Sequence, residues 1–216
     1  MGIRKDAIMK SKSALVLEEL RSKLRTASVA QVGGFRPTAD PITSWFLKGV
    51  ALPGEGLPVW KGQPMFPLLQ IRVDELPVIP EQLKGIALLV LYHNMESHPF
   101  DKPHGEGWLI REYATLDGLE LLPAINTPYR AFPVRWVSVN DDAPGWEDAW
   151  DIIDLSDVND DEDASDRFYD GFNRYRGTKV GGYPMEIQHG AGIQDFVFQV
   201  GSEEKVNWMW ADNGIG

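Results

Sequence analysis

Carboxylates are concentrated in one segment of this 216-residue chain, where they could bind a cation or a basic partner. Residues 141–170 hold thirteen acidic residues and one basic residue, a local charge of −12 in a chain of net charge −11. Oxygen-bearing side chains alternate from Asp157 to Ser165, as ligands do in an EF-hand calcium loop. The sixth position of such a loop should be glycine and is Glu162, and the twelfth should be glutamate and is Phe168. The segment therefore indicates a solvated or partner-facing acidic surface and no metal site.

Histidine is the next residue type that could do chemistry, and three of the four histidines lie close together at His93, His98 and His104. Pro99 and Pro103 exclude the single helix that carries the H-E-x-x-H ligands of a zinc hydrolase. We interpret the three as loop histidines without a catalytic role. A metal-dependent hydrolase that uses them or the acidic segment is the least favoured function.

Other catalytic signatures are missing from the sequence. The chain has no cysteine, which excludes disulfides, thiolate metal sites and a cysteine nucleophile. It has no G-x-S-x-G nucleophile motif, and the Gly181-Gly182 pair lacks the Lys-Ser/Thr of a phosphate-binding loop. The sequence therefore predicts no catalytic residue and no cofactor, and the protein is expected not to be an enzyme.

Two large aromatic residues lie within the acidic segment. Trp146 and Trp150 are four positions apart, which places them on one face of a helix beside carboxylates. Aromatic anchors surrounded by charge are typical of protein interfaces. The residues predicted to contact a basic protein partner are Trp146, Trp150, Asp157, Asp160, Asp161 and Asp163.

The distribution of charge also excludes other partners. Outside residues 141–170 the charges nearly cancel, at 20 basic and 19 acidic residues, so no basic face for nucleic acid is expected. No apolar run reaches the ~18 residues of a membrane span, and residues 1–12 lack the apolar region of a secretory signal. These features predict a cytoplasmic protein that neither spans nor binds membranes, and they leave its oligomeric state open.

A turn followed by a glutamine-bearing apolar segment occurs twice. Gly49 precedes Gln70 by 21 residues, and Gly182 precedes Gln199 by 17. A unit repeated at this length suggests an internally duplicated fold. Because a glutamine among apolar neighbours must find hydrogen-bond partners, Gln70 and Gln199 either tie each turn to its sheet or face a ligand between the two halves.

These motifs and their order resemble the YwqG-like family, bacterial cytoplasmic proteins of unknown function. The resemblance covers roughly half the chain. It rests on the lysine-valine-glycine-glycine-x-proline turn at 179–184, the phenylalanine-x-x-glutamine strand at 196–200, the tryptophan-alanine-aspartate-asparagine-glycine motif at 210–214, and first-half motifs at 64–71 and 74–77. It implies two similar halves and, through the association of such proteins with toxin systems, an immunity role. The family's chain continues as a further strand, so the resemblance implies that this chain is either truncated at Gly216 or ends unusually early there.

Apolar patterns alternate between strand and helix without a βαβ rhythm, which predicts an α+β fold with a largely antiparallel or mixed sheet. The amphipathic, basic segment 3–27 predicts a helix that packs on the sheet, with a position on a membrane surface as the alternative. The chain is expected to form one domain from helix 3–27, a first half at about 28–95, an acidic insertion at about 96–171 and a second half at about 172–216.

Taken together, the sequence predicts a non-enzymatic binding protein. The favoured hypothesis is an immunity protein that neutralises a basic toxin through the acidic surface, because opposite charge accelerates association. The alternative is a small-molecule or peptide-binding module that uses a cleft near Gln70 and Gln199.

Overall fold

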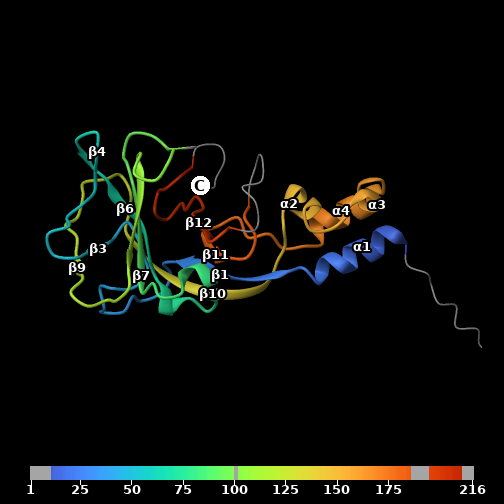
Figure 1. The fold of residues 1–216 in the computed structure, drawn as a ribbon, viewed down its shortest axis with the longest axis horizontal. Coiled ribbons are helices and arrows are strands. Elements are labelled where there is room, and N and C mark those ends of the chain that lie inside the picture. Colours follow the sequence, from blue (N-terminus) through green and yellow to red (C-terminus); the bar gives the residue numbers. More distant parts are fainter. Residues whose placement is uncertain (1–10, 100–101, 186–194, 211–216) are drawn as a thin grey trace, which may run out of the picture.

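The protein has a sheet on one side and a group of helices on the other (Figure 1). A computed structural model describes residues 11–99, 102–185 and 195–210. Two long neighbouring strands, β1 (Arg25–Val32) and β10 (Phe132–Asp142), extend from the helices into the sheet. The fold is therefore mixed α+β, as the sequence predicts.

The main sheet is curled, has eight strands, and is antiparallel at every recorded pairing. In spatial order its strands are β12 (Phe198–Gln199), β11 (Lys179–Gly181), β1, β10, β2 (Trp45–Phe46), β6 (Phe66–Arg72), β7 (Leu88–His93) and β8 (Trp108–Tyr113). The short elements beside it are β3 (Val50–Ala51), which pairs with β9 (Glu120–Leu121), β4 (Val59–Trp60), which pairs with β5 (Gln63–Pro64), and the 3₁₀ turns η1 (Val73–Glu75) and η2 (Glu81–Leu83).

Apolar residues cover both faces of the central strands. In β7, Leu89 and Leu91 join one core cluster, whereas Leu88, Val90 and Tyr92 join another on the opposite face. This alternation follows from the two-residue period of a strand. It explains why β6 and β7 read as continuous apolar runs in the sequence.

The helices form a separate group, the helical lobe, with its own apolar core. Its members are α1 (Lys12–Arg21), α2 (Trp146–Trp150), α3 (Ser156–Asn159) and α4 (Glu162–Asp170). Leu20 and Phe168 are fully buried within this core. Among the described residues, no helix is both long enough and apolar enough to cross a membrane.

The N-terminal helix differs from the prediction in its extent and its position. The predicted helix 3–27 is wrong at its C-terminal end, because residues from Arg25 onward form β1 and pair with β10 and β11. Backbone bonds on both sides of β1 outweigh a weak helical preference there. Residues 3–10 lie outside the described part of the chain. The expected packing of this helix on the sheet is also wrong, because α1 packs on α3 and α4.

The segment predicted as an insertion is divided between the two parts of the fold. Residues 96–171 include β8 and β10, which belong to the main sheet, and β10 lies near its centre. Only the part from α2 to α4 leaves the sheet, between β10 and β11, to form most of the helical lobe.

Candidate functional site: the acidic helical lobe

Most carboxylates of the acidic segment lie on the surface of the helical lobe. Asp157, Asp160 and Asp163 are exposed on α3, at its end and on α4. Arg167 is the basic residue of this segment, and its guanidinium donates to the Asp163 carbonyl oxygen at 3.0 Å. All three carboxylates are therefore exposed to solvent, and Asp160 also accepts from Asn159 Nδ2 at 3.4 Å.

Asp161, predicted to contact the partner with them, has a structural role. Its Oδ1 accepts from the Ala164 N–H at 3.1 Å and so caps the N-terminus of α4. Its Oδ2 accepts from the Ser13 hydroxyl at 2.6 Å and so joins α4 to α1. The Ser13 bond, followed by the backbone bond to Ala164, lowers the pKa of Asp161. Both oxygens therefore bond within the fold, which distinguishes Asp161 from the three exposed carboxylates.

The two predicted tryptophan anchors are brought together, but only one is exposed. Trp146 is half-buried, edge-on to the buried Phe168 at a ring-centroid distance of 4.8 Å. Trp150 meets Trp146 edge-on at 6.0 Å and is 39% exposed. Tyr169 stacks on Trp146 at a centroid distance of 5.7 Å and is 55% exposed. Trp150 and Tyr169 thus both contact Trp146, and the three rings form one aromatic patch on the lobe.

Two acidic residues of the same segment, Asp142 and Asp148, are buried. Asp142, at the end of β10, is fully buried and accepts from Lys179 Nζ at 2.6 Å and from the Tyr183 N–H at 2.8 Å. Its other oxygen accepts from the Tyr175 N–H at 3.2 Å. Burial lowers the pKa of Lys179, opposed by the attraction of Asp142. The Asp142 carboxylate thus connects the end of β10, where the chain enters the lobe, to the turn at residues 181–184. Lys179, the first residue of the 179–184 motif, pairs with Asp142 and so has a structural role.

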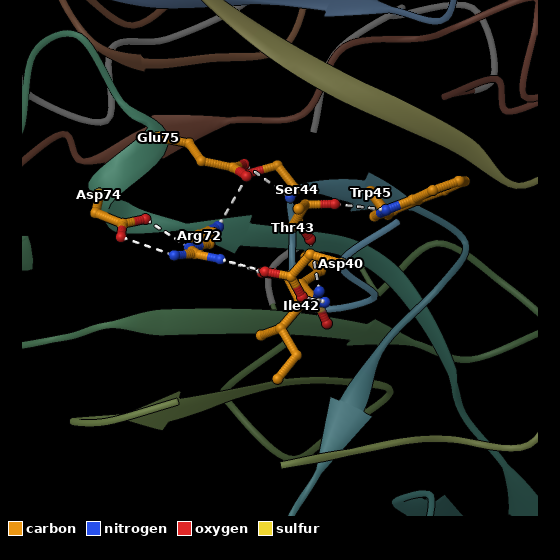
Figure 2. A network of polar contacts seen from close by, with 9 residues as sticks. Asp40, Ile42, Thr43, Ser44, Trp45, Arg72, Asp74 and Glu75 are labelled. Carbon is orange, nitrogen blue, oxygen red and sulfur yellow. Dashed lines mark hydrogen bonds and ion pairs between the residues drawn. The ribbon is translucent and has the colours of Figure 1, made fainter. Parts of the chain in front are cut away.

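Gln70, offered by the sequence as a ligand contact or a structural tie, has the structural role. Its Oε1 accepts from the Val50 N–H at 3.0 Å, and its Nε2 donates to the Thr43 carbonyl at 2.6 Å. The side chain is 1% exposed. Figure 2 shows the neighbouring turn, where the Arg72 guanidinium contacts Asp40 and Asp74.

Gln199, on the edge strand β12, makes the same pair of contacts. Its Oε1 accepts from the Met185 N–H at 3.0 Å, and its Nε2 donates to the Gly177 carbonyl at 2.8 Å. It is 4% exposed. Both amides are therefore buried and committed to backbone groups, and ligand binding by Gln70 and Gln199 stays a prediction.

Comparison with known proteins gives the chain a family. Residues 50–216 match the family described as Domain of unknown function (DUF1963). The chain belongs to this family. None of the curated proteins matches it.

The DUF1963 match begins at β3 and so omits α1, β1 and β2. Yet β1 lies between β11 and β10 in the sheet, and α1 closes the core of the helical lobe. Residues before the matched range therefore complete both parts of this member of the family. The family description assigns no activity, and the YwqG-like assignment stays a prediction.

One of the three clustered histidines lies in the sheet. His93 was expected in a loop but is the last residue of β7 and is 2% exposed. It packs edge-on against Trp208 and Trp210 at centroid distances of 5.0 and 5.5 Å, and against His98 at 5.6 Å. The sequence offered one signal that His93 belongs to this strand, which is its position directly after the apolar run of residues 86–92. Trp208 and Trp210 are more than 100 residues away in the sequence, so their contact with His93 could not be predicted from it.

These histidines do not assemble into a metal centre within the described residues. No group of three or more His, Asp or Glu side chains there is close enough to hold an ion. His104 lies apart from the other two and accepts from the Ile110 N–H at 2.9 Å. What holds the His93 ring in place is its burial among aromatic rings and its hydrogen bond to the Asn94 carbonyl oxygen.

Proposed function

We propose that this DUF1963 protein is a non-enzymatic binding protein that acts in the cytoplasm as an immunity protein and neutralises a basic bacterial toxin. The contact surface is the acidic face of the helical lobe. The observation that carries the proposal is that exposed carboxylates and an exposed aromatic patch occur on the same small lobe. The YwqG-like resemblance of the sequence supports the toxin as the partner class.

Charge supplies the first part of recognition. Asp157, Asp160 and Asp163 are exposed, and the lobe segment carries −12 while the rest of the chain is nearly neutral. A field of one sign attracts an oppositely charged partner and raises the association rate by about 10- to 1,000-fold. The partner is therefore expected to present a basic surface, which the active site of a toxin that binds phosphate-bearing substrates would provide.

Aromatic contacts supply the second part. Trp150 and Tyr169 are exposed, and both rings rest on Trp146, which holds them in place. Ordered aromatic side chains lose little conformational entropy on binding and dominate the energy of many interfaces. The anchor pair is therefore Trp150 and Tyr169, in place of the Trp146 and Trp150 pair that the sequence suggests.

The test uses the product of the reading frame next to the gene for this chain. That product is expressed in a bacterial host with and without the full chain, and survival is counted. Survival should be restored by the wild-type chain and lost with the double variant Trp150→Ala, Tyr169→Ala. A non-toxic neighbour, or equal rescue by both chains, contradicts the proposal.

Two triple variants, each of which removes three negative charges, separate the role of the lobe surface from that of overall net charge. Asp157→Asn, Asp160→Asn, Asp163→Asn removes three exposed carboxylates from the lobe, and Asp161 is kept because it caps α4. The matched control removes three exposed carboxylates from the sheet side, through Glu112→Gln, Asp117→Asn and Glu120→Gln. Only the first variant should weaken rescue.

We also infer that the sheet contains two related units, residues 25–72 and 132–201, with α2 to α4 inserted in the second. The hydrogen bonds repeat at equivalent positions. Ser44 Oγ accepts from the N–H two residues after Gln70, and Thr178 Oγ1 accepts from the N–H two residues after Gln199. Each unit's first strand pairs with the second strand of the other unit, β1 with β11 and β10 with β2. These boundaries replace the predicted halves 28–95 and 172–216.

A further inference from the structure

A cavity of about 290 Å³, the Lys48 cavity, lies beside the short strand β2. Its lining comes from β2 and the turn that follows it, from the first residues of β6, and from residues 121–131, which precede β10. Apolar side chains make up most of this lining, and Lys48 is the only charged residue among the described residues that form it. Cavities of ~150 Å³ accept a benzene molecule, so this one has room for an aromatic ring with a short side chain.

The backbone after β2 shapes this space. Leu47 has a φ of +57°, a conformation that is rare for a bulky residue, and strained backbone of this kind is concentrated at ligand sites. Gly49 runs close to β6, because a Cβ there would lie 2.7 Å from Pro67 Cβ. The Gly49 carbonyl oxygen accepts from the Leu122 N–H at 2.9 Å, and residues 122–131 then form neither helix nor strand. That segment is therefore tied to the turn at its start but does not pair along β2 or β6, which leaves the cavity between them.

The cation of the cavity is accessible and has no anionic partner among the described residues. The Lys48 Nζ lies 4.2 Å from the centre of the Trp45 ring, and Trp45 Nε1 donates to Thr43 Oγ1 at 2.8 Å, which fixes that ring (Figure 2). Both Lys48 and Trp45 line the cavity. No described carboxylate pairs with Lys48, which is half-buried, and its Nζ is not among the buried nitrogens that lack a hydrogen-bond partner. A ligand in the cavity can therefore reach the ammonium.

The charge and the polarity of the lining restrict the class of ligand. One ammonium balances one negative charge, and the described lining offers no second cation for a dianion such as a phosphate monoester. It also has no carboxylate that would repel an anion or pair with a cationic ligand. The rest of the lining is mainly aliphatic and aromatic, which favours a ligand with an apolar body.

We propose that the Lys48 cavity binds a small aromatic monocarboxylate, with its carboxylate on the Lys48 ammonium and its ring against the apolar walls. The ion pair fixes the orientation of the ligand, and apolar contacts with residues such as Phe66 and Ile125 supply most of the affinity. The site lies in the sheet and is independent of the acidic surface on the helical lobe.

The test compares two probes of nearly the same shape by titration calorimetry on the full chain at neutral pH. Cinnamate carries a carboxylate, and cinnamamide has an uncharged amide in its place. Wild type should bind cinnamate roughly tenfold more tightly than cinnamamide, because only the carboxylate forms an ion pair with the ammonium.

Two lysine variants show whether this preference comes from Lys48. Lys48→Met keeps a side chain of similar length but removes the charge, so the two probes should bind with similar affinity. Lys61→Met is the matched control, because Lys61 Nζ also lies over a tryptophan, 4.1 Å from the centre of the Trp60 ring, but Lys61 does not line this cavity. Lys61→Met should keep the preference of the wild type for cinnamate.

A third variant fills the cavity. Ile125 is a half-buried lining residue, and Ile125→Trp should abolish binding of both probes while a melting temperature close to that of the wild type shows that the protein is folded. Ile79→Trp, at a position that is 43% exposed and outside the cavity, should bind both probes like the wild type. Equal binding of the two probes to the wild type, no binding of either, an undiminished preference in Lys48→Met, or retained binding by Ile125→Trp overturns the proposal.

Discussion

His93 is neutral because its surroundings exclude water and offer no charge to pair with. Its ring packs among Phe66, Trp208 and Trp210, and desolvation lowers its pKa from the ordinary 6.5 to about 4. Its neighbour His98 adds a smaller lowering effect by repulsion. A histidine in this state accepts a hydrogen bond but does not transfer protons at pH 7.

This burial predicts a specific dependence of stability on pH. The unfolded chain takes up a proton on His93 near pH 6.5, whereas the folded chain takes it up only near pH 4. The unfolded state therefore binds more protons between these values, and folding stability should fall as the pH falls through that window. The loss attributable to His93 should be at most about 3 kcal/mol.

Urea unfolding of wild type and His93→Phe at pH 7 and at pH 4 measures this effect. The loss between the two pH values should be smaller in His93→Phe by up to that amount. Other titrating groups, including His98, are present in both proteins and largely cancel in the difference. The same loss in both proteins would show that His93 is not desolvated in solution.

At the scale of elements, the turn at residues 181–184 is hydrogen-bonded to Asp142, the last residue of β10 before the chain enters the helical lobe. Gly182 has φ of +78°, a conformation that glycine adopts without strain. A Cβ at this position would collide with the Asp142 carboxylate and lie 3.0 Å from Ala27 Cβ. The glycine is therefore required by the buried Asp142–Lys179 pair as well as by the backbone.

Gly182→Ala should destabilise the protein by at least about 3 kcal/mol, because it combines a positive φ with the loss of a buried ion pair. Gly177→Ala is the control, since its Cβ would meet no heavy atom within 4 Å. That variant should stay within about 0.5 kcal/mol of wild type. Denaturant unfolding measures both, and equal stability of the two variants would contradict this account of the turn.

The paired glutamines give a second prediction at this scale. Gln70→Leu removes the acceptor of the fully buried Val50 N–H, and Gln199→Leu removes the acceptor of the Met185 N–H. Gln70→Leu should cost about 1–3 kcal/mol, because it leaves a buried donor without a partner, and Gln199→Leu should cost about 1 kcal/mol or more, because the Met185 N–H is part-buried. Similar costs by denaturant unfolding support two related units, and a negligible cost at either position contradicts the equivalence.

Elements with strong apolar patterns were predictable from the sequence. The apolar stretches at residues 68–73, 86–92, 108–113 and 134–139 overlap β6, β7, β8 and β10. The end of the N-terminal helix was not predictable, because its residues are taken into β1 by pairing with strands more than 100 residues away. The bond between Asp161 and Ser13 was not predictable either, because it depends on where α1 packs.

At the scale of the whole molecule, the two parts carry different chemical features. The sheet holds an apolar cavity of about 240 Å³ between β7, β8 and β12, and the helical lobe holds most of the negative charge. The charge asymmetry was visible in the sequence because it lies in one continuous segment. The cavity was not, because its walls come from β7, β8 and β12, which meet only when the sheet curls.

On the helical lobe, the carboxylates and the aromatic residues are proposed to act at different stages of binding, so each variant should change a different rate constant. The triple variant Asp157→Asn, Asp160→Asn, Asp163→Asn should lower the association rate with the purified toxin by roughly tenfold, because steering acts before contact. Trp150→Ala should leave that rate nearly unchanged and raise the dissociation rate by roughly tenfold, because it removes a desolvated contact.

Salt gives the decisive comparison, measured by stopped-flow association at 0.1 M and 1 M salt. The Debye length shrinks from ~10 Å to ~3 Å over this range, so steering of the wild type should largely disappear. At 1 M salt the wild type, the triple variant and the sheet-side control (Glu112→Gln, Asp117→Asn, Glu120→Gln) should associate at similar rates. At 0.1 M only the triple variant should be slow. If the control slows as much as the triple variant, overall charge and not the lobe surface guides the partner.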